Sequence, residues 1–409
     1  MIDTFEVTNR IPSLGIYIHI PFCIKKCGYC DFNTYSGLDN LKSDYTNAVI
    51  KEIEGWGQKA SQCVVDSISF GGGTPGEMPA EQLSSILNAV KKSFFVLENA
   101  EVTLEANPGT TTSNSMKSFV SAGFTRISFG AQSFSDRNLK FLDRIHAPET
   151  ISASLDLAKI AGFKSINLDL MYGLRGQTLK AWDRDLKTAC ELNPDHLSLY
   201  NLTVEEGTPL YERVEKGEVT LPSDDTSADF YEHASKELSN SGYVHYELSN
   251  WAKPGHESKH NYGYWTWKSY LGVGAGAHGF LEGFRFENIA HPGAYIDASQ
   301  KGSSPESVIL KREYPGLDVS VADWITTHLR LIKGFEERDF YEEFGIEIEV
   351  IAGQILFELC EADIIERFNS TIQLTPRGRL LHSEVALSLI HISAPTRPRL
   401  ISYAVFCLK

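Results

Sequence analysis

Three cysteines near the N-terminus have the type and spacing of metal-cluster ligands. Cys23, Cys27 and Cys30 are spaced C-x3-C-x2-C. Three thiolates from one short loop suit three corners of a cubane iron–sulfur cluster. No fourth cysteine follows at close range, so the fourth iron is left without a cysteine ligand from this loop. We therefore expect a [4Fe–4S] cluster with an open coordination position, which a reactive metal centre needs.

Two other uses of cysteine fit the sequence less well. A structural zinc site takes four ligands, usually from two separated pairs, whereas Cys63, Cys190, Cys360 and Cys407 are isolated singles. A disulfide framework is not expected, because seven cysteines over 409 residues are sparse and odd in number. A zinc-stabilised binding protein stays open as a hypothesis, which metal analysis finding zinc but no iron or sulfide would favour.

Glycines and polar side chains follow successive predicted strands where those strands end. The run Gly71–Pro75 offers unblocked backbone groups to a ligand, although glycine-rich strand exits also form plain tight turns. Glu105, Gln132, Arg144 and Asp169 occupy comparable places. Each has an alternative interpretation. Glu105 could be a solvated glutamate at the rim of the sheet, and the other three could be loop or capping residues whose hydrogen bonds are made within the protein. Together they offer the acceptors and the cation that a zwitterionic nucleoside ligand requires.

A repeated β-α pattern supplies the scaffold for these residues. The predicted strands are 16–20, 64–70, 101–106, 125–130, 165–170 and 196–202. The predicted helices between them are 41–55, 80–94, 113–122, 150–161 and 179–192. Six such repeats predict an α/β fold with a parallel sheet, either open or curved into a barrel. Active sites in such folds gather where strands end and loops begin.

The domain organisation changes after the repeats. We predict a barrel over 1–220, an aromatic and glycine-rich barrel extension over 221–291, and a linker over 292–315. Several helices followed by a hairpin predict a small winged-helix-like C-terminal domain over 316–386. The stretch 387–409 resembles translated sequencing-adaptor read-through, and we expect it to be a non-native tail.

Bulk properties exclude several classes of function. The chain is 42% hydrophobic and carries a formal charge of −15, which argues against nonspecific nucleic-acid binding. No apolar stretch reaches the roughly 18 residues of a membrane span. The N-terminus lacks the layout of a signal peptide. We expect a cytoplasmic protein, a monomer or homodimer, since a reducing compartment suits an oxygen-sensitive cluster.

The ordered series of motifs resembles the radical S-adenosylmethionine (SAM) superfamily. The cysteine spacing together with 17–23, 71–75, 132–134 and 167–170 is similar to its oxygen-independent coproporphyrinogen III oxidase branch. The resemblance implies a partial (β/α)6 barrel, a [4Fe–4S] cluster on the three cysteines, and SAM chelating the free iron. The family's SAM contacts fall on Tyr17, Tyr29, Gly72, Gly73, Thr74, Glu105, Gln132, Arg144, Asp169 and Thr203.

One position separates two functional classes within that branch. The porphyrinogen oxidases carry a further cysteine two residues beyond the third cluster cysteine, where this chain has Phe32. The run Cys30-Asp31-Phe32-Asn33 is similar to the HemW group. That resemblance implies a haem chaperone, which binds haem or a porphyrin and delivers haem to an acceptor protein. The alternative is a radical SAM enzyme of porphyrin biosynthesis that oxidatively decarboxylates coproporphyrinogen III.

A histidine in an aromatic run is the candidate haem ligand. The run 259–265, Lys-His-Asn-Tyr-Gly-Tyr-Trp, resembles the His-Asn-x-x-Tyr-Trp element of the HemW group. Neutral imidazole is a good axial ligand for haem iron, which makes His260 the candidate and His278 a second one. The alternative is an aromatic core cluster in which His260 is hydrogen-bonded.

Overall fold

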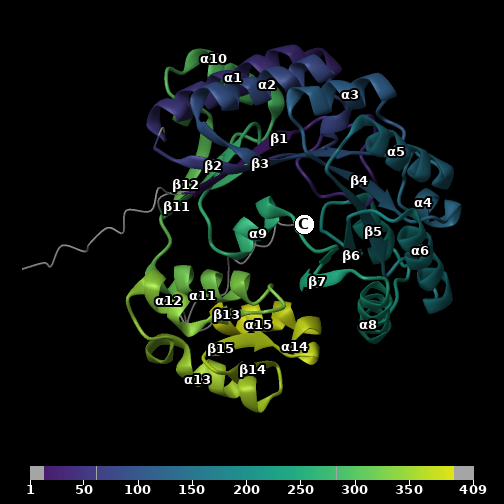
Figure 1. Cartoon of the computed structure of the whole chain (residues 1–409), viewed down its shortest axis with the longest axis vertical. Helices are drawn as coiled ribbons and strands as arrows, with labels where there is room; N and C mark the ends of the chain where they lie inside the picture. Colours follow the sequence, from purple (N-terminus) through teal and green to yellow (C-terminus); the bar gives the residue numbers. More distant parts are fainter. Residues whose placement is uncertain (1–12, 61, 282, 391–409) are drawn as a thin grey trace, which may run out of the picture.

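A 12-stranded sheet organises most of the molecule (Figure 1). A computed structural model describes residues 13–60, 62–281 and 283–390 of the chain. The strands follow the order β12-β11-β10-β9-β1-β2-β3-β4-β5-β6-β8-β7. Strands β1 to β6 run parallel. Helices cover the outer face of the curved sheet, and its inner face turns toward the middle of the molecule (Figure 1).

The first half of the chain alternates strand and helix, as predicted. The parallel strands are β1 (Ser13–Ile20), β2 (Val64–Gly72), β3 (Phe95–Ala106), β4 (Arg126–Gln132), β5 (Ser165–Tyr172) and β6 (His196–Asn201). The helices among and just after them are α1 (Lys42–Lys59), α2 (Ala80–Ser93), α3 (Ser113–Ala122), α4 (Asp136–Phe141), α5 (Pro148–Ala161), α6 (Leu179–Leu192), α7 (Pro209–Glu215) and α8 (Asp224–Asn240). The predicted partial β/α barrel is confirmed.

The alternation of side chains along β1 shows how the barrel separates its core from its functional face. Ile16, Ile18 and Ile20 are fully buried in the main hydrophobic core. Tyr17 and His19 point the other way, because successive residues of a strand face opposite sides of the sheet. The three isoleucines therefore pack against the helices on the outer side of the sheet, and Tyr17 and His19 face its concave side.

Antiparallel strands extend the sheet at both ends. Beyond β6 lie β8 (Asn250–Ala252) and β7 (Val244–Glu247). On the other side, β9 (Tyr270–Val273) pairs with β1 in parallel. It is followed by β10 (His278–Leu281), β11 (Phe284–Asn288) and β12 (Ile309–Glu313), which pair antiparallel. The predicted barrel extension thus belongs to the main sheet.

The segment 292–315 is folded, in contrast to the predicted linker. It contains α10 (Pro292–Lys301), a 3-10 turn η3 (Pro305–Val308) and strand β12. Proline at the first helical position favours the start of α10, and Tyr295 and Ile296 bury themselves against the main core. The run Gly-Ser-Ser-Pro is therefore a short connection between two packed elements.

A second domain follows the sheet and has its own core. It consists of α11 (Leu317–His328), β13 (Phe335–Glu336), α12 (Glu337–Phe344), α13 (Ile348–Glu361), β14 (Ile365–Phe368), β15 (Thr371–Leu374), α14 (Pro376–Leu380) and α15 (His382–Ile390). Its three strands form an antiparallel sheet, β13-β15-β14. Trp324, Phe340 and Ile372 lie in the shared core. The prediction of helices followed by a hairpin is confirmed.

Part of the predicted non-native tail belongs to this domain. Residues 387–390 complete helix α15, and the side chain of Leu389 is fully buried. The buried leucine shows that the domain continues beyond the predicted boundary at residue 386. The remainder of that prediction, residues 391–409, lies outside the described residues.

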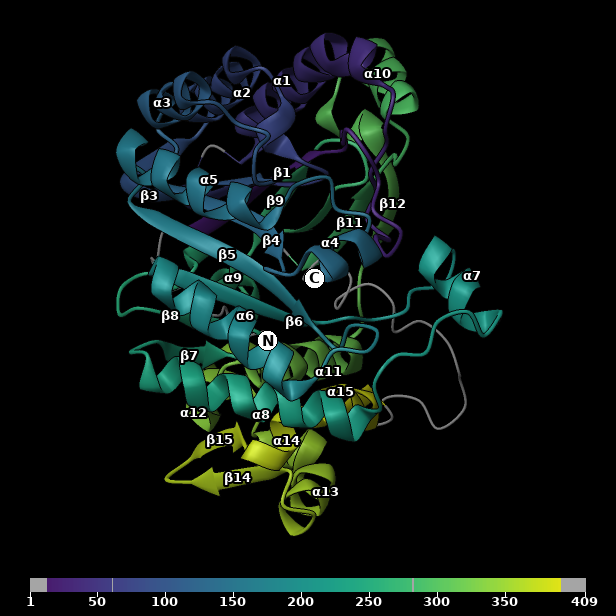
Figure 2. The same ribbon diagram turned by 90° about the vertical axis from the view of Figure 1, so that its right-hand side faces the viewer.

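The two domains meet through short backbone contacts and helix α9 (Lys259–Trp265). Helix α9 lies between the sheet and the second domain (Figure 1). The Leu248 N–H donates to the Arg330 carbonyl at 3.0 Å, and the Ile332 N–H donates to the Tyr246 carbonyl at 3.1 Å. On the outer side, α6 packs beside α8 (Figure 2).

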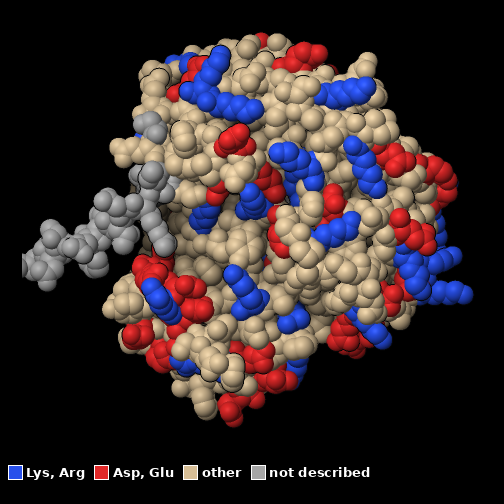
Figure 3. Space-filling view, in the orientation of Figure 1, with Lys and Arg blue, Asp and Glu red and all other residues tan. Residues whose placement is uncertain are grey.

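The described part of the chain shows neither a membrane span nor a basic face in the view of Figure 3. Among the described residues, no helix is both long and apolar enough to cross a membrane. On the face shown in Figure 3, Lys and Arg side chains are interspersed with Asp and Glu. That face lacks the continuous basic surface that nucleic acids require.

Candidate functional site

A cavity of about 730 Å³ lies at the ends of strands β2 to β6 and reaches the second domain. Its volume falls within the roughly 300–1,000 Å³ usual for ligand sites. The three cysteines line it. So do nine of the ten predicted SAM contacts: Tyr29, Gly72, Gly73, Thr74, Glu105, Gln132, Arg144, Asp169 and Thr203. Residues far apart in the sequence are thus brought together because parallel strands end at one edge of the sheet.

The cysteine loop is attached to the end of β1. The Cys23 N–H donates to the Tyr35 carbonyl at 3.0 Å, and the Cys30 N–H donates to the Cys27 carbonyl at 3.2 Å. All three thiols are free and half-buried. Burial raises the pKa of the Cys23 thiol to about 11 and also raises the pKa of the Cys30 thiol. A bound metal would offset this cost, since a cation favours the thiolate.

The glycines after β2 let the cysteine loop approach the sheet. The Gly73 N–H donates to the Ile20 carbonyl at 2.8 Å, and the Thr74 N–H donates to the Phe22 carbonyl at 2.9 Å. A Cβ on Gly73 would lie 2.6 Å from the Phe22 carbonyl oxygen. Gly72 has a φ of 110°, and a Cβ there would lie 2.4 Å from the His19 ring. Both glycines are thus required by the chain's own packing, and both also face the cavity.

Arg144 connects the cysteine loop to the strand ends. Its Nη1 lies 3.5 Å from the Cys27 sulfur, and its Nη2 donates to the Gly130 carbonyl at 2.6 Å and to the Asn107 side chain. Asn107 in turn donates to the Thr74 hydroxyl at 3.0 Å. The guanidinium is therefore held in place beside a thiol that would carry negative charge in the metal-bound form.

Gln132 shows two signs of a ligand-binding residue. Its backbone adopts a left-handed φ of 66°, which is uncommon outside glycine and is often found at functional sites. Its Oε1 is buried and accepts no hydrogen bond from the described residues. Because an unpaired buried acceptor is costly, a ligand donor at this position would restore the lost hydrogen bond.

Two carboxyl groups face the same cavity. Glu105 accepts a hydrogen bond from the Gly72 N–H at 3.3 Å. Burial, with the nearby Asp169 charge, raises the pKa of Glu105 to about 7. Asp169 accepts from the Ser128 hydroxyl at 3.0 Å and from Asn167 at 2.7 Å, and burial raises its pKa. The pair suits a ligand that presents an ammonium group or hydroxyl donors.

Tyr17 does not line the cavity in this structure. Its hydroxyl donates to Nδ1 of His19 at 3.0 Å, and Nε2 of His19 donates to the Asn33 carbonyl at 2.9 Å. The ring nevertheless lies close to Glu105, because a Cβ on Gly71 would contact both side chains, at 3.0 Å and 2.9 Å. Tyr17 thus lies near Glu105 but outside the lining of the cavity.

His260 is buried and hydrogen-bonded at both ring nitrogens. Nδ1 lies 3.2 Å from the Ser67 hydroxyl and Nε2 lies 2.9 Å from the Tyr264 hydroxyl. Burial lowers the pKa of His260 to about 3, so its imidazole is neutral near pH 7. Haem ligation at His260 would require one of these two hydrogen bonds to break.

The aromatic run around His260 lines a second, smaller cavity. This cavity of about 80 Å³ is lined by Tyr264, Trp267, Tyr270, His278 and Phe280, among others. It lies on the β9–β12 side of α9, while Asn261 of the same helix faces the large cavity. Helix α9 therefore separates two compartments, and its His260 side chain lines neither of them.

Several cavity residues were not predicted from the sequence. Asn107 follows β3 directly, so its place after a strand was a usable signal. Arg126 is 3% exposed and donates to the Ser165 hydroxyl at 2.8 Å. Arg330 and Arg379 come from the second domain. No sequence pattern indicated that the second domain would cover the strand ends.

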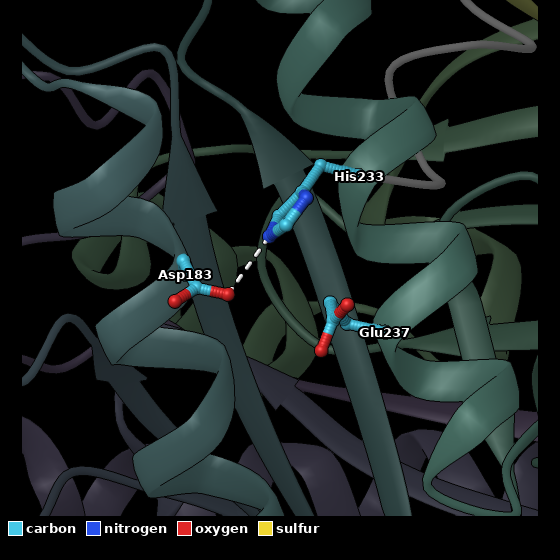
Figure 4. A group of neighbouring side chains, drawn as sticks. All are labelled: Asp183, His233 and Glu237. Atoms are coloured by element: carbon cyan, nitrogen blue, oxygen red, sulfur yellow. Dashed lines mark hydrogen bonds and ion pairs between the residues drawn. The ribbon is translucent and has the colours of Figure 1, made fainter.

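A group of possible metal ligands lies away from the cavity, on the outer helices. Asp183 of α6 faces His233 and Glu237 of α8 (Figure 4). Nε2 of His233 lies 3.0 Å from one Asp183 oxygen, and the Lys187 ammonium lies 2.8 Å from the other. Both oxygens are thus already partnered, and the group acts as a polar contact between the two helices.

Comparisons with known proteins agree with this geometry. Residues 17–189 match the family model of the radical SAM superfamily. The heme chaperone HemW of Haemophilus influenzae is 36% identical over 92% of this chain and 97% of its own length. The heme chaperone HemW of Escherichia coli is 35% identical over 91% of this chain and 96% of its own length. The chain belongs to the HemW family.

A solved structure outside the HemW family has a fold similar to that of this chain. Coproporphyrinogen III oxidase (HemN) from Escherichia coli, a radical SAM enzyme, superposes with a TM-score of 0.79. It covers 92% of this chain and 90% of the solved chain at 23% identity. At that level of identity the likeness concerns the fold, and it includes both domains.

Membership of the radical SAM superfamily carries a [4Fe–4S] cluster and SAM as cofactors. The residues of the large cavity fit both groups. Three free thiols from one loop match the cluster's need for cysteine ligands. The unpaired Gln132 oxygen can accept a hydrogen bond, and so can the carboxyl groups of Glu105 and Asp169, whose pKa values are raised by burial. These acceptors match a ligand with several hydrogen-bond donors.

Proposed function

We propose that this chain is a haem chaperone that binds haem and a SAM-ligated [4Fe–4S] cluster and delivers haem to an acceptor protein. The observation that carries the proposal is the similarity to proteins named heme chaperone HemW, at 35–36% identity over more than 90% of this chain. Phe32 supports it, because this side chain lines the cavity at the position where the oxidase branch has a cysteine.

We propose that Cys23, Cys27 and Cys30 bind the cluster. SAM would contact the nine predicted residues that line the cavity, with Arg144 beside a cluster thiolate and Glu105 and Asp169 as acceptors for its donor groups. When bound, the cluster and SAM supply one-electron chemistry at an open iron position. The chain's own contribution is to hold the thiols on a fixed loop and to place acceptors around the ligand.

For haem, we propose an imidazole ligand from His260. The neutral state of this buried ring suits iron ligation, and the Tyr264 hydroxyl is the partner that ligation through Nε2 would displace. His278, at the rim of the smaller cavity, is the second candidate.

Paired assays on one anaerobically reconstituted sample test the proposal. We expect haemin to bind with a saturable Soret shift, which His260→Ala weakens, and we expect no conversion of coproporphyrinogen III. Conversion of coproporphyrinogen III to protoporphyrinogen would instead show an oxidase. A Soret band unchanged on titration would overturn the haem chaperone.

We also propose a cytoplasmic location and a monomeric or homodimeric state. The cysteines that the structure describes form no disulfide, which suits a reducing compartment. We likewise propose that the chain divides into a barrel (1–220), a barrel extension (221–291) and a C-terminal domain. This division is supported by the separate core of the second domain.

A further inference from the structure

The large cavity extends beyond the residues assigned to the cluster and SAM. Its far end lies between the barrel and the second domain. The barrel side is formed by Tyr200, Tyr231 and Leu248, and the second domain contributes Arg330 and Arg379, among others. Aromatic and apolar walls with a few charged side chains are typical of small-molecule sites, and a guanidinium in such a wall suits a carboxylate.

Arg379 is a cation without an anionic partner at this end. It is half-buried on helix α14, and its Nε is fully buried without a hydrogen-bond acceptor. Among the residues that the structure describes, none forms an ion pair with it. Asp224 of helix α8 and Glu384 of helix α15 also line the cavity, and both are exposed. A partly buried guanidinium in this state is costly unless an anion pairs with it.

Arg330, the neighbouring arginine, has an anionic partner in the protein, although its Nε, like that of Arg379, is buried without a hydrogen-bond acceptor. Its guanidinium lies 4.1 Å from the centroid of the Trp265 ring and pairs with Glu247 at 3.2 Å. It also lies 3.4 Å from the Ser249 hydroxyl. The two arginines therefore differ in their partners. Arg330 pairs with an anion and joins the domains, whereas Arg379 has no anionic partner among the described residues and is available to a ligand.

We infer that Arg379 binds a carboxylate of a flat, largely apolar ligand held between the barrel and the second domain. The inference rests on the proposed function, under which this carboxylate is a propionate of haem. It does not depend on ligation by His260, whose side chain lines neither cavity. Guanidinium–carboxylate pairs are charge-assisted and frequently bidentate. The walls formed by Tyr231, Tyr200 and Leu248 supply the aromatic and apolar contacts that a porphyrin body needs.

The test compares two arginines on helix α14 with two forms of the ligand. Arg379→Gln removes the charge in the cavity. Arg377→Gln is the matched control, because Arg377 is exposed, two residues away, and does not line the cavity. Each protein, reconstituted with its cluster, is titrated with haemin and with haemin dimethyl ester, in which both propionates are esterified.

We expect Arg379→Gln to weaken haemin binding by about tenfold or more and to leave binding of the dimethyl ester unchanged. Arg377→Gln should match the wild type with both ligands. Unchanged ester binding and cluster content show that the variant is folded. Equal haemin affinity of Arg379→Gln and wild type would overturn the role of Arg379. Failure of the wild type to bind either ligand would instead overturn the proposed function.

Discussion

The thiols of Cys23, Cys27 and Cys30 decide whether the chain can hold an iron–sulfur cluster. Their loop is fixed by backbone hydrogen bonds within itself and by one from the β2 exit, from the Thr74 N–H to the Phe22 carbonyl. Replacement of one thiol therefore removes a ligand without removing the loop's own supports.

Cys27→Ser should reduce bound iron and acid-labile sulfide to a small fraction of the wild-type content, because a hydroxyl is a poor cluster ligand. Iron and sulfide analysis after anaerobic reconstitution measures this. Cys63→Ser is the control, since Cys63 precedes β2 and does not line the cavity. Full cluster content in Cys27→Ser would contradict the assignment.

If Glu105 accepts from SAM as proposed, we expect SAM binding to depend on pH. Its pKa is raised to about 7, so the carboxyl is largely neutral at pH 6 and ionised at pH 8. Because an ammonium ligand needs the ionised form, affinity for SAM should rise with pH, by up to about tenfold per unit below pH 7.

Calorimetric titration at pH 6, 7 and 8 measures this slope. Glu105→Gln should bind more weakly and lose most of the dependence. Glu98→Gln is the matched control, because Glu98 is exposed on the same strand. A slope retained in Glu105→Gln would assign the dependence to another group.

At the scale of elements, the β-α repeats were predictable because their apolar periodicity is local. The structure differs mainly at boundaries. Strand β3 begins at Phe95, six residues earlier than predicted, because the chain passes from α2 into the strand with one intervening residue. The segment 292–315 was predicted as a linker because its Gly, Ser and Pro residues mark turns. Burial of Tyr295 against the core depends on contacts that the local sequence does not show.

Glu52 of α1 connects the β-α repeats to the segment after β9 through hydrogen bonds. Its carboxylate accepts from the Tyr295 hydroxyl at 2.6 Å, the Asn288 amide at 2.8 Å and the Gly274 N–H at 2.9 Å. Glu52→Gln places an amide donor among these donors, and should lower the free energy of unfolding by about 1–3 kcal/mol. Chemical denaturation measures it. Glu54→Gln, exposed on the same helix, should be neutral, and equal effects of the two variants would contradict this role.

At the scale of the whole molecule, the second domain completes the cavity. Sequence motifs predicted the residues at the strand ends, since those ends share one edge. They did not predict Arg330 or Arg379, because the docking of the second domain depends on long-range packing through Leu248 and α9. Position 260 agrees with the alternative interpretation of its motif, an aromatic cluster in which His260 is hydrogen-bonded, since both ring nitrogens have partners.

In the Glu247–Arg330 pair between the domains, Glu247 is fully inaccessible and the Arg330 side chain is 17% exposed. Arg330→Met alone should lower the free energy of unfolding by about 3 kcal/mol, because it leaves a carboxylate buried without its cation. The double variant Glu247→Leu, Arg330→Met should recover most of that loss. Denaturation of the wild type, both single variants and the double variant gives the coupling energy. Additive losses would show that the pair is not coupled.

The most direct test of the haem chaperone is the transfer of haem out of the loaded protein. Cluster-reconstituted protein carrying haem is mixed with excess apomyoglobin, and the Soret spectrum is followed over time. We expect a defined haem complex that transfers its haem to the acceptor, at a rate that His260→Ala increases. Haem that never binds, or bound haem that stays on the protein throughout, would contradict a haem carrier.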